Sequence, residues 1–148
     1  IMDGLVGSEM CIRDRLGSTF IVGGQIKDQP PELYLVYPQG NYIRPADSKP
    51  YLVIGEVKYG KPILDRVITP KVSIGDASRC ALISMDSTLK SDLTVGPPID
   101  FAVIKKDEIK IASLKCLNMN DPEFSKVCNQ WSQGIFKIFD SFQRFDWE

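Results

Sequence analysis

The sequence predicts an α+β fold, and the order of its apolar segments is the main reason. Short apolar runs bounded by Gly and Pro come first, and two stretches with helical spacing follow them. A second pair of strand-like runs and a long amphipathic helix complete the chain. Blocks of strands separated by blocks of helices are typical of α+β layers rather than of alternating βαβ units. The 148 residues suffice for one domain with a core.

Three strands are expected in the first part of the chain. They are TFIVGG (19–24), a strand within ELYLVYPQGN (32–41) and PYLVIGE (50–56). Each is rich in β-branched or aromatic residues and ends near Gly or Pro. Their nearly continuous apolar character indicates strands that are covered on both faces.

Two helices are expected next, over Gly60–Pro70 and Ser73–Ser91. Proline in the first turn and proline beyond the end bound the first of them. Ser73 and Asp76 form a plausible capping box at the start of the second. That helix carries one apolar stripe, namely Ile74, Ala77, Ala81, Met85 and Leu89. Apolar residues off the stripe, namely Cys80, Leu82 and Ile83, suggest cover on more than one side.

The remainder predicts a hairpin and a terminal helix. The hairpin spans Ile99–Leu117 and turns at Lys106–Glu108, and the helix spans Asp121–Phe142 with Asp121 as its N-cap. Helical spacing places eight apolar residues on one stripe, namely Phe124, Val127, Cys128, Trp131, Ile135, Ile138, Phe139 and Phe142. Such a stripe is typical of core packing.

Composition excludes several classes of function. The net charge of −1 argues against a nucleic-acid binder, and no apolar run is long enough to cross a bilayer. The four cysteines form no CxxC or zinc spacing, so we expect free thiols in a reducing cytosol and no metal site. The chain has no histidine, which removes Ser/His and Cys/His catalytic pairs but not threonine or amino-terminal chemistry.

The opening stretch LVGSEMCIRDR (5–15) has neither strand nor helix periodicity. Its reverse translation can be written as the transposase adapter used to prepare sequencing libraries. We therefore expect residues 1–15 to be adapter-derived and not native, with a disordered tail as the alternative. On this expectation, residues 16–148 are the C-terminal part of a longer domain that extends upstream of Leu16.

From Ser18 onward the sequence resembles the proteasome-type peptidases, and among them the bacterial ancestral β-subunit (Anbu) group. The most specific matching stretches are GEVKYGKPILDR (55–66) and DSTLKSDLTVGPPID (86–100). GGQIK (23–27), LYLVYPQGN (33–41) and the late DW (146–147) add to the match. The resemblance implies a four-layer α–β–β–α sandwich, the N-terminal nucleophile hydrolase fold, of which this chain would hold the C-terminal part.

The resemblance also implies peptide-bond hydrolysis by an amino-terminal threonine whose own α-amine accepts the proton, with no cofactor. The family's nucleophilic threonine, aspartate and lysine lie in its first half, so we expect no catalytic residue in this fragment and no activity from it alone. Thr19 precedes an apolar strand and would not be terminal, so we reject it as the nucleophile. The implied partners are further copies of the subunit and a peptide or unfolded-protein substrate, in the cytoplasm, with neither nucleic acid nor membrane.

Two later positions match family motifs that support the active threonine. Gly55-Glu56 stands where the family has Gly-Ser. Glu56 carries no hydroxyl, which puts the direct role of the family serine's hydroxyl in doubt for this chain. The family's Asp-x-x-Ser followed by Gly resembles Ser91 to Gly96, in which Thr94 keeps the hydroxyl. Ser91 replaces the carboxylate there, unless Asp92 supplies it through a shifted register. The alternative is that Ser91 and Thr94 merely end a helix and satisfy backbone groups.

Other interpretations stay open. The parent protein could be a non-catalytic scaffold subunit of a proteasome-like complex, because the fold alone does not fix the function. Without the resemblance, the sequence indicates only a soluble α+β domain. The grouped charges Lys58, Lys61, Asp65 and Arg66 are consistent with a solvated helix face or with a contact between subunits.

Overall fold

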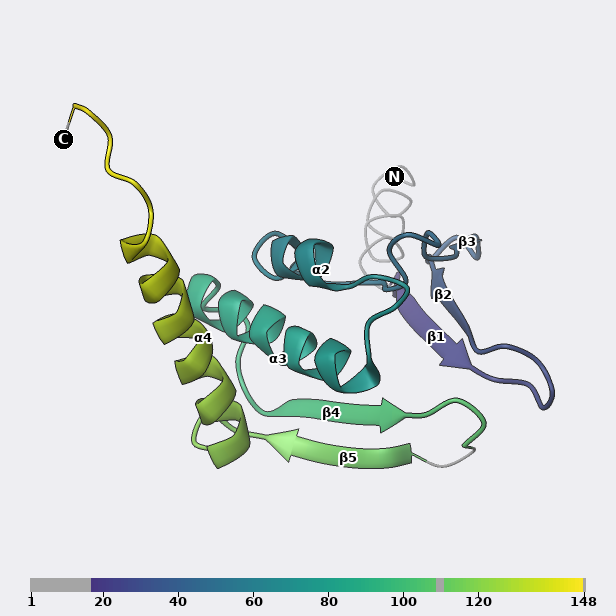
Figure 1. The fold of residues 1–148 in the computed structure, drawn as a ribbon. Helices are drawn as coiled ribbons and strands as arrows, with labels where there is room; N and C mark the ends of the chain where they lie inside the picture. The colour runs from purple at the N-terminus through teal and green to yellow at the C-terminus, as the bar shows by residue number, and fades with distance from the viewer. Residues whose placement is uncertain (1–16, 109–110, 148) are drawn as a thin grey trace, which may run out of the picture. The chain divides into compact units, whose positions relative to one another are not determined.

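A computed structural model describes residues 17–108 and 111–147. The expectation for residues 1–15 therefore lies outside the described residues. The chain forms two compact units, the first ending at Ile54 and the second running from Gly55 to the C-terminus. Each unit has its own antiparallel sheet, and all the described helices belong to the second unit (Figure 1). The α+β class is confirmed.

The first unit is a three-stranded sheet in the order β1-β2-β3, with β1 at Phe20–Gly24, β2 at Glu32–Val36 and β3 at Tyr42–Ile43. Gly24 of β1 pairs with Glu32 of β2, and Val36 of β2 pairs with Tyr42 of β3. The β2–β3 connection is a tight turn in which the Gly40 N–H donates to the Tyr37 carbonyl at 2.9 Å. Gly40 has φ +87°, which explains the glycine in YPQGN.

The expected third strand is wrong. Pro50–Glu56 forms no strand among the described residues, and the third strand is the shorter β3, which precedes it. A strand depends on backbone pairing with a neighbour, and β-propensity alone cannot supply that neighbour.

The second unit contains α2 at Lys61–Val67, α3 at Ile74–Ser91 and α4 at Pro122–Asp140. The helices α3 and α4 begin at the predicted caps, and α2 begins with the predicted proline in its first turn. Asp121 accepts from the backbone N–H groups of Glu123 and Phe124 at 3.0 and 3.1 Å. Ser73 accepts from the Asp76 N–H at 3.1 Å and donates its hydroxyl to the Asp76 carboxylate at 2.6 Å. Both caps satisfy backbone donors that a helix start otherwise leaves without a partner.

The buried side of α3 differs in part from the predicted stripe. Ile74 and Ala81 are exposed, whereas Cys80, Asp86 and Thr88 are buried. The helix is covered on a second side by α2, where the Cys80 thiol faces the Ile63 carbonyl at 3.9 Å. The predicted cover on more than one side is therefore confirmed.

The predicted hairpin is confirmed as β4 (Ile99–Ile104) and β5 (Ile111–Leu117), paired from Ile99 with Leu117 onward. Its inner face packs on α3 and α4 around a small core. That core consists of Leu117, Phe124 and Cys128, with Leu82, Leu89, Ile99 and Phe101 packed against it.

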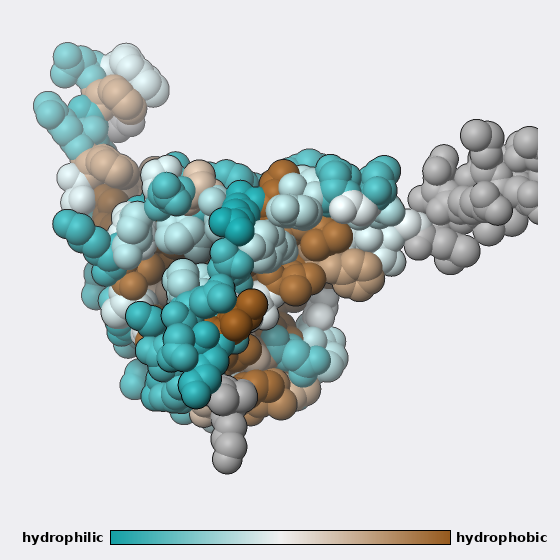
Figure 2. All heavy atoms as spheres, turned by 90° about the vertical axis from the view of Figure 1, so that its right-hand side faces the viewer, coloured by the Kyte–Doolittle hydropathy of each residue, from teal (hydrophilic) through white to brown (hydrophobic). Residues whose placement is uncertain are grey.

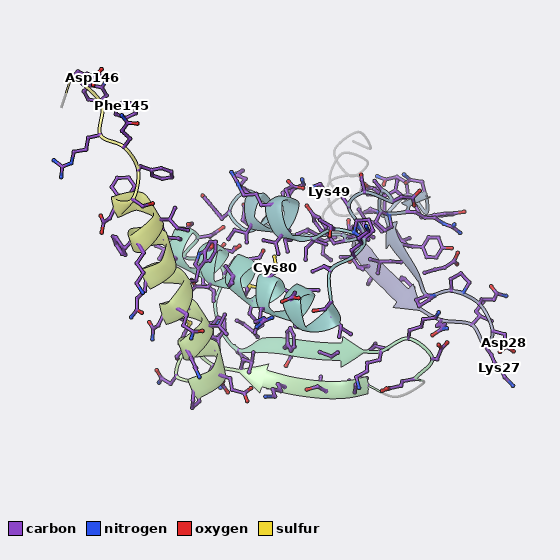
Figure 3. All side chains as sticks on the ribbon, viewed as in Figure 1. Lys27, Asp28, Lys49, Cys80, Phe145 and Asp146 are labelled. Carbon is purple, nitrogen blue, oxygen red and sulfur yellow. The ribbon has the colours of Figure 1, made fainter. Side chains whose placement is uncertain are left out.

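Much apolar surface lies open. In the first half of the predicted α4 stripe, Phe124 and Cys128 are buried and Val127 and Trp131 are half-buried. The remaining residues, Ile135, Ile138, Phe139 and Phe142, are 47–69% exposed. Hydrophobic residues are also open on the face of the molecule in Figure 2. Beyond α4, a tail that includes Phe145 and Asp146 leads away from the helix (Figure 3). None of the described helices is both long and apolar enough to cross a membrane.

Candidate functional site

The loop after α3 holds a compact hydroxyl–carboxylate pair. The Asp92 carboxylate accepts from the Thr94 hydroxyl at 2.7 Å and from the Thr94 backbone N–H at 2.8 Å. The same aspartate caps α3, because its own N–H donates to the Thr88 carbonyl at 2.9 Å. The end of the helix therefore fixes the position of the pair.

The Gly55-Glu56 turn is shaped by its glycine. Gly55 has φ +81°, a conformation that L side chains rarely adopt. The Glu56 carboxylate accepts from the Lys58 backbone N–H at 2.9 Å, and the Lys58 ammonium lies 3.9 Å from the other Glu56 oxygen. The Glu56 carboxylate thus closes the turn by a hydrogen bond to the backbone and holds the Lys58 ammonium nearby.

Lys58 links the two motif positions electrostatically. The pKa of Asp92 lies below its ordinary value because the Thr94 hydroxyl first, and then the Thr94 N–H, donate hydrogen bonds to its carboxylate. Burial opposes this effect, and the positive charge of Lys58 adds a still smaller lowering. The lysine that contacts Glu56 therefore also acts on Asp92. Lys58 thus pairs with Glu56 and contributes a small part of the lowered pKa of Asp92.

Ser91 has a different place. It is the exposed last residue of α3, and the Thr94 hydroxyl donates to Asp92. The Asp92–Thr94 pair is the arrangement that the shifted register requires, in which Asp92 rather than Ser91 supplies the carboxylate. It is also a local Asx-type turn, which loops form without any catalytic role.

The described residues of this neighbourhood offer support rather than reaction chemistry. A carboxylate with a lowered pKa is a weak base at neutral pH, and the Thr94 proton is held by that carboxylate. The hydroxyl oxygen keeps its lone pairs, so it can accept a hydrogen bond from an approaching N–H group. Thr19, rejected above as a nucleophile, lies immediately before β1.

The three described cysteines are free thiols. Burial raises the pKa of Cys80, and burial together with the neighbouring Asp86 raises the pKa of Cys128 to about 11. Burial first, and then Asp100, raise the pKa of Cys116. A thiol with a raised pKa is a poor nucleophile at neutral pH. Across the described ranges, no group of three His, Cys, Asp or Glu side chains is placed to hold a metal ion.

Two packing features could not be predicted from the sequence. A side chain at Gly60 would approach Ser84 and Thr88 of α3, so α2 and α3 meet closely at that glycine. The second feature is a polar cluster between α3 and α4 around the buried Asp86. Asp86 accepts from the Lys90 ammonium at 2.8 Å and from the Cys128 thiol, and Lys90 also reaches Ser132 at 3.3 Å. Only the packing of α4 against α3 reveals that Asp86 is buried.

The proteasome subunit family model matches residues 11–104, which is more than half of the chain. The chain therefore belongs to the proteasome subunit family. A search of curated proteins found no match.

Within that family the chain is similar to ancestral β-subunits. The Anbu structure from Yersinia bercovieri is 37% identical with a TM-score of 0.86, and the alignment covers 97% of this chain and 62% of that one. Anbu from Hyphomicrobium sp. strain MC1 is 39% identical with a TM-score of 0.84, and the alignment covers 96% of this chain and 62% of that one. The structure of the helical assembly of the Anbu complex from Pseudomonas aeruginosa is 42% identical with a TM-score of 0.83. That alignment covers 88% of this chain and 54% of the Pseudomonas chain. The chain thus spans little more than half of these relatives' length.

Proposed function

We propose that the chain belongs to a subunit of a proteasome-type threonine endopeptidase. Membership of the proteasome subunit family and similarity to ancestral β-subunits support this proposal. The observation that carries it is the Asp92–Thr94 pair, because it provides a carboxylate and a hydroxyl at the family motif that supports the nucleophile.

In the proposed reaction, the hydroxyl of an amino-terminal threonine attacks the peptide carbonyl, and the threonine's α-amine accepts the hydroxyl proton. An ester forms as the C–N bond breaks and the leaving amine takes up a proton. Water then hydrolyses the ester and regenerates the threonine. The nucleophile and its aspartate and lysine partners lie outside residues 16–148 in this proposal, so the 148-residue chain alone should be inactive.

Thr94 and Asp92 would position the amine. Asp92 holds the Thr94 proton, so the Thr94 oxygen is oriented as an acceptor and suits the N–H groups of a terminal amine. The Gly55-Glu56 turn, joined to Asp92 through Lys58, would support the same region. Ser91 would contribute through the end of α3.

The proposed subunit works as a homo-oligomer on peptide or unfolded-protein substrates, in the cytosol and without a cofactor. Similarity to a protein that forms a helical assembly supports the oligomer. Three free thiols among the described residues support a reducing compartment.

The test uses the protein expressed from its genomic reading frame and a fluorogenic peptide. Thr94→Val should lower kcat about five- to tenfold, the worth of one hydrogen bond, whereas Thr94→Ser should stay near the wild-type rate. The 148-residue chain should give no turnover. Unchanged turnover in Thr94→Val would remove the proposed role of Thr94. A genomic-frame protein that hydrolyses no peptide would favour a scaffold subunit.

A further inference from the structure

Asp86 of α3 is a buried carboxylate that the proposed reaction has not yet used. Its side chain is 2% exposed, and it accepts hydrogen bonds from the Lys90 ammonium at 2.8 Å and from the Cys128 thiol of α4. Lys90 also donates to the Ser132 hydroxyl of α4 at 3.3 Å. Cys128 and Ser132 lie one helical turn apart, so these polar contacts join the second half of α3 to two successive turns of α4 (Figure 1).

Stability alone does not explain a charge at this place. A buried carboxylate loses its hydration, and a well-packed apolar pair of similar volume is often at least as stable as a buried ion pair. Apolar cover is close at hand, because Cys128 belongs to the core formed with Leu117 and Phe124. Hydrogen bonds fix both distance and direction, whereas apolar contacts tolerate repacking. The polar cluster therefore fixes how α3 lies against α4 more sharply than apolar packing alone would.

The part of α3 that the cluster holds leads directly into the Asp92–Thr94 pair. Less than two helical turns separate Asp86 from Asp92. The Asp92 N–H donates to the carbonyl of the buried Thr88 at 2.9 Å, and the Asp92 carboxylate holds Thr94. A rotation or a slide of this end of α3 would therefore carry Asp92 and Thr94 with it as a unit.

We propose that Asp86 and Lys90 are positioning residues, which fix the end of α3 against α4 and thereby hold the Asp92–Thr94 pair where the amine of the amino-terminal threonine needs it. This inference rests on the proposed function and adds two residues that act through the pair rather than on the substrate. A misplacement of about 1 Å can slow a reaction strongly even when its cause lies far from the reacting atoms. Loss of the cluster should thus slow the reaction even where it leaves the fold stable.

The test is the double variant Asp86→Leu/Lys90→Met, in the protein expressed from its genomic reading frame. Because no buried charge remains, its free energy of unfolding in urea should stay close to the wild-type value. The hydrogen-bonded N–H groups of Asp92, Thr94 and Val95 should nevertheless exchange with deuterium at least about threefold faster, as measured by mass spectrometry. With a fluorogenic peptide, kcat should fall about fivefold and KM should change less than about twofold, because the pair positions the amine and not the substrate.

Three further variants complete the design. Lys90→Arg keeps a cation beside Asp86 and should stay near the wild type in exchange and in kcat. Lys115→Met/Glu123→Leu is the matched control, because it removes an ion pair between β5 and α4 whose side chains are 45% and 75% exposed, and it should change neither readout. Ser132→Ala removes only the contact of Lys90 with α4 and should raise the exchange about twofold, which tests the proposal even if the double variant does not fold.

Exchange at the wild-type rate in both the double variant and Ser132→Ala overturns the proposal. Faster exchange with an unchanged kcat in the double variant also overturns it, because the cluster would then not position the reacting groups. A wild-type protein that turns over no peptide contradicts the proposed peptidase instead, and the exchange measurements still decide whether the cluster fixes the Asp92–Thr94 pair.

Discussion

At the scale of single residues, the hydrogen bond between Thr94 and Asp92 can be tested directly. The Thr94 hydroxyl makes the largest contribution to the low pKa of Asp92, and Lys58 makes a smaller one. Thr94→Val should therefore raise the pKa of Asp92 toward its ordinary value, Thr94→Ser should keep it low, and Lys58→Met should raise it less than Thr94→Val. Carboxyl chemical shifts followed by NMR through a pH titration measure these changes.

The sign of the pH dependence follows from the same pair. A carboxyl whose pKa is lowered by folding stabilises the folded state above its ordinary pKa and loses that effect as pH falls through the lowered value. The contribution of Asp92 should thus be lost on acidification, and earlier in Thr94→Val than in wild type. An Asp92 pKa that does not respond to Thr94→Val would contradict the described hydrogen bond.

Gly60 gives a second test at this scale. A Cβ at Gly60 would lie 2.9 Å from the Ser84 carbonyl oxygen and closer still to the Ser84 hydroxyl, so α2 and α3 would have to separate. Gly60→Ala should lower the free energy of unfolding by about 1–3 kcal/mol. Gly134→Ala, in α4 with open space around it, should instead raise it by up to about 1 kcal/mol. Urea denaturation of both variants measures whether their free energies of unfolding change in opposite directions.

At the scale of elements, the helices follow from local signals and the strands only in part. Pro62, Ser73 and Asp121 mark the starts of α2, α3 and α4, because a cap acts within three residues of its own position. Pro50–Glu56 fails as a strand because pairing is not a local property.

The Asp86–Lys90 pair between α3 and α4 tests how much the burial of Asp86 matters for stability. Lys90→Met leaves the Asp86 carboxylate buried without its cation, which should cost roughly 1–3 kcal/mol of folding free energy. Asp86→Leu combined with Lys90→Met should recover much of that loss, because no buried charge remains. Lys61→Met breaks an exposed pair with Asp65 and should change stability by less than about 0.5 kcal/mol. Equal losses in Lys90→Met and Lys61→Met would contradict the burial of Asp86.

At the scale of the whole molecule, residue patterns predicted the class of fold, and the three-dimensional structure added the relations between motifs. The sequence singled out Gly55-Glu56 and Ser91 to Thr94 separately. Only the folded chain shows that Lys58 pairs with Glu56 and slightly lowers the pKa of Asp92, because the two motifs lie more than thirty residues apart. A surface hollow of about 330 Å³ lined by residues of α2, α3 and α4 likewise has no signature in the sequence, since its wall combines residues from three helices.

Sequencing the genomic DNA upstream of the Leu16 codon tests both the proposed peptidase and the adapter origin of residues 1–15. We expect a reading frame that does not encode LVGSEMCIRDR and that leads back to a start codon followed by threonine. An aspartate and a lysine should follow that threonine in the family register. A frame with no such threonine would contradict the peptidase and favour a scaffold subunit. A genome that encodes LVGSEMCIRDR at this place would contradict the adapter origin of residues 1–15.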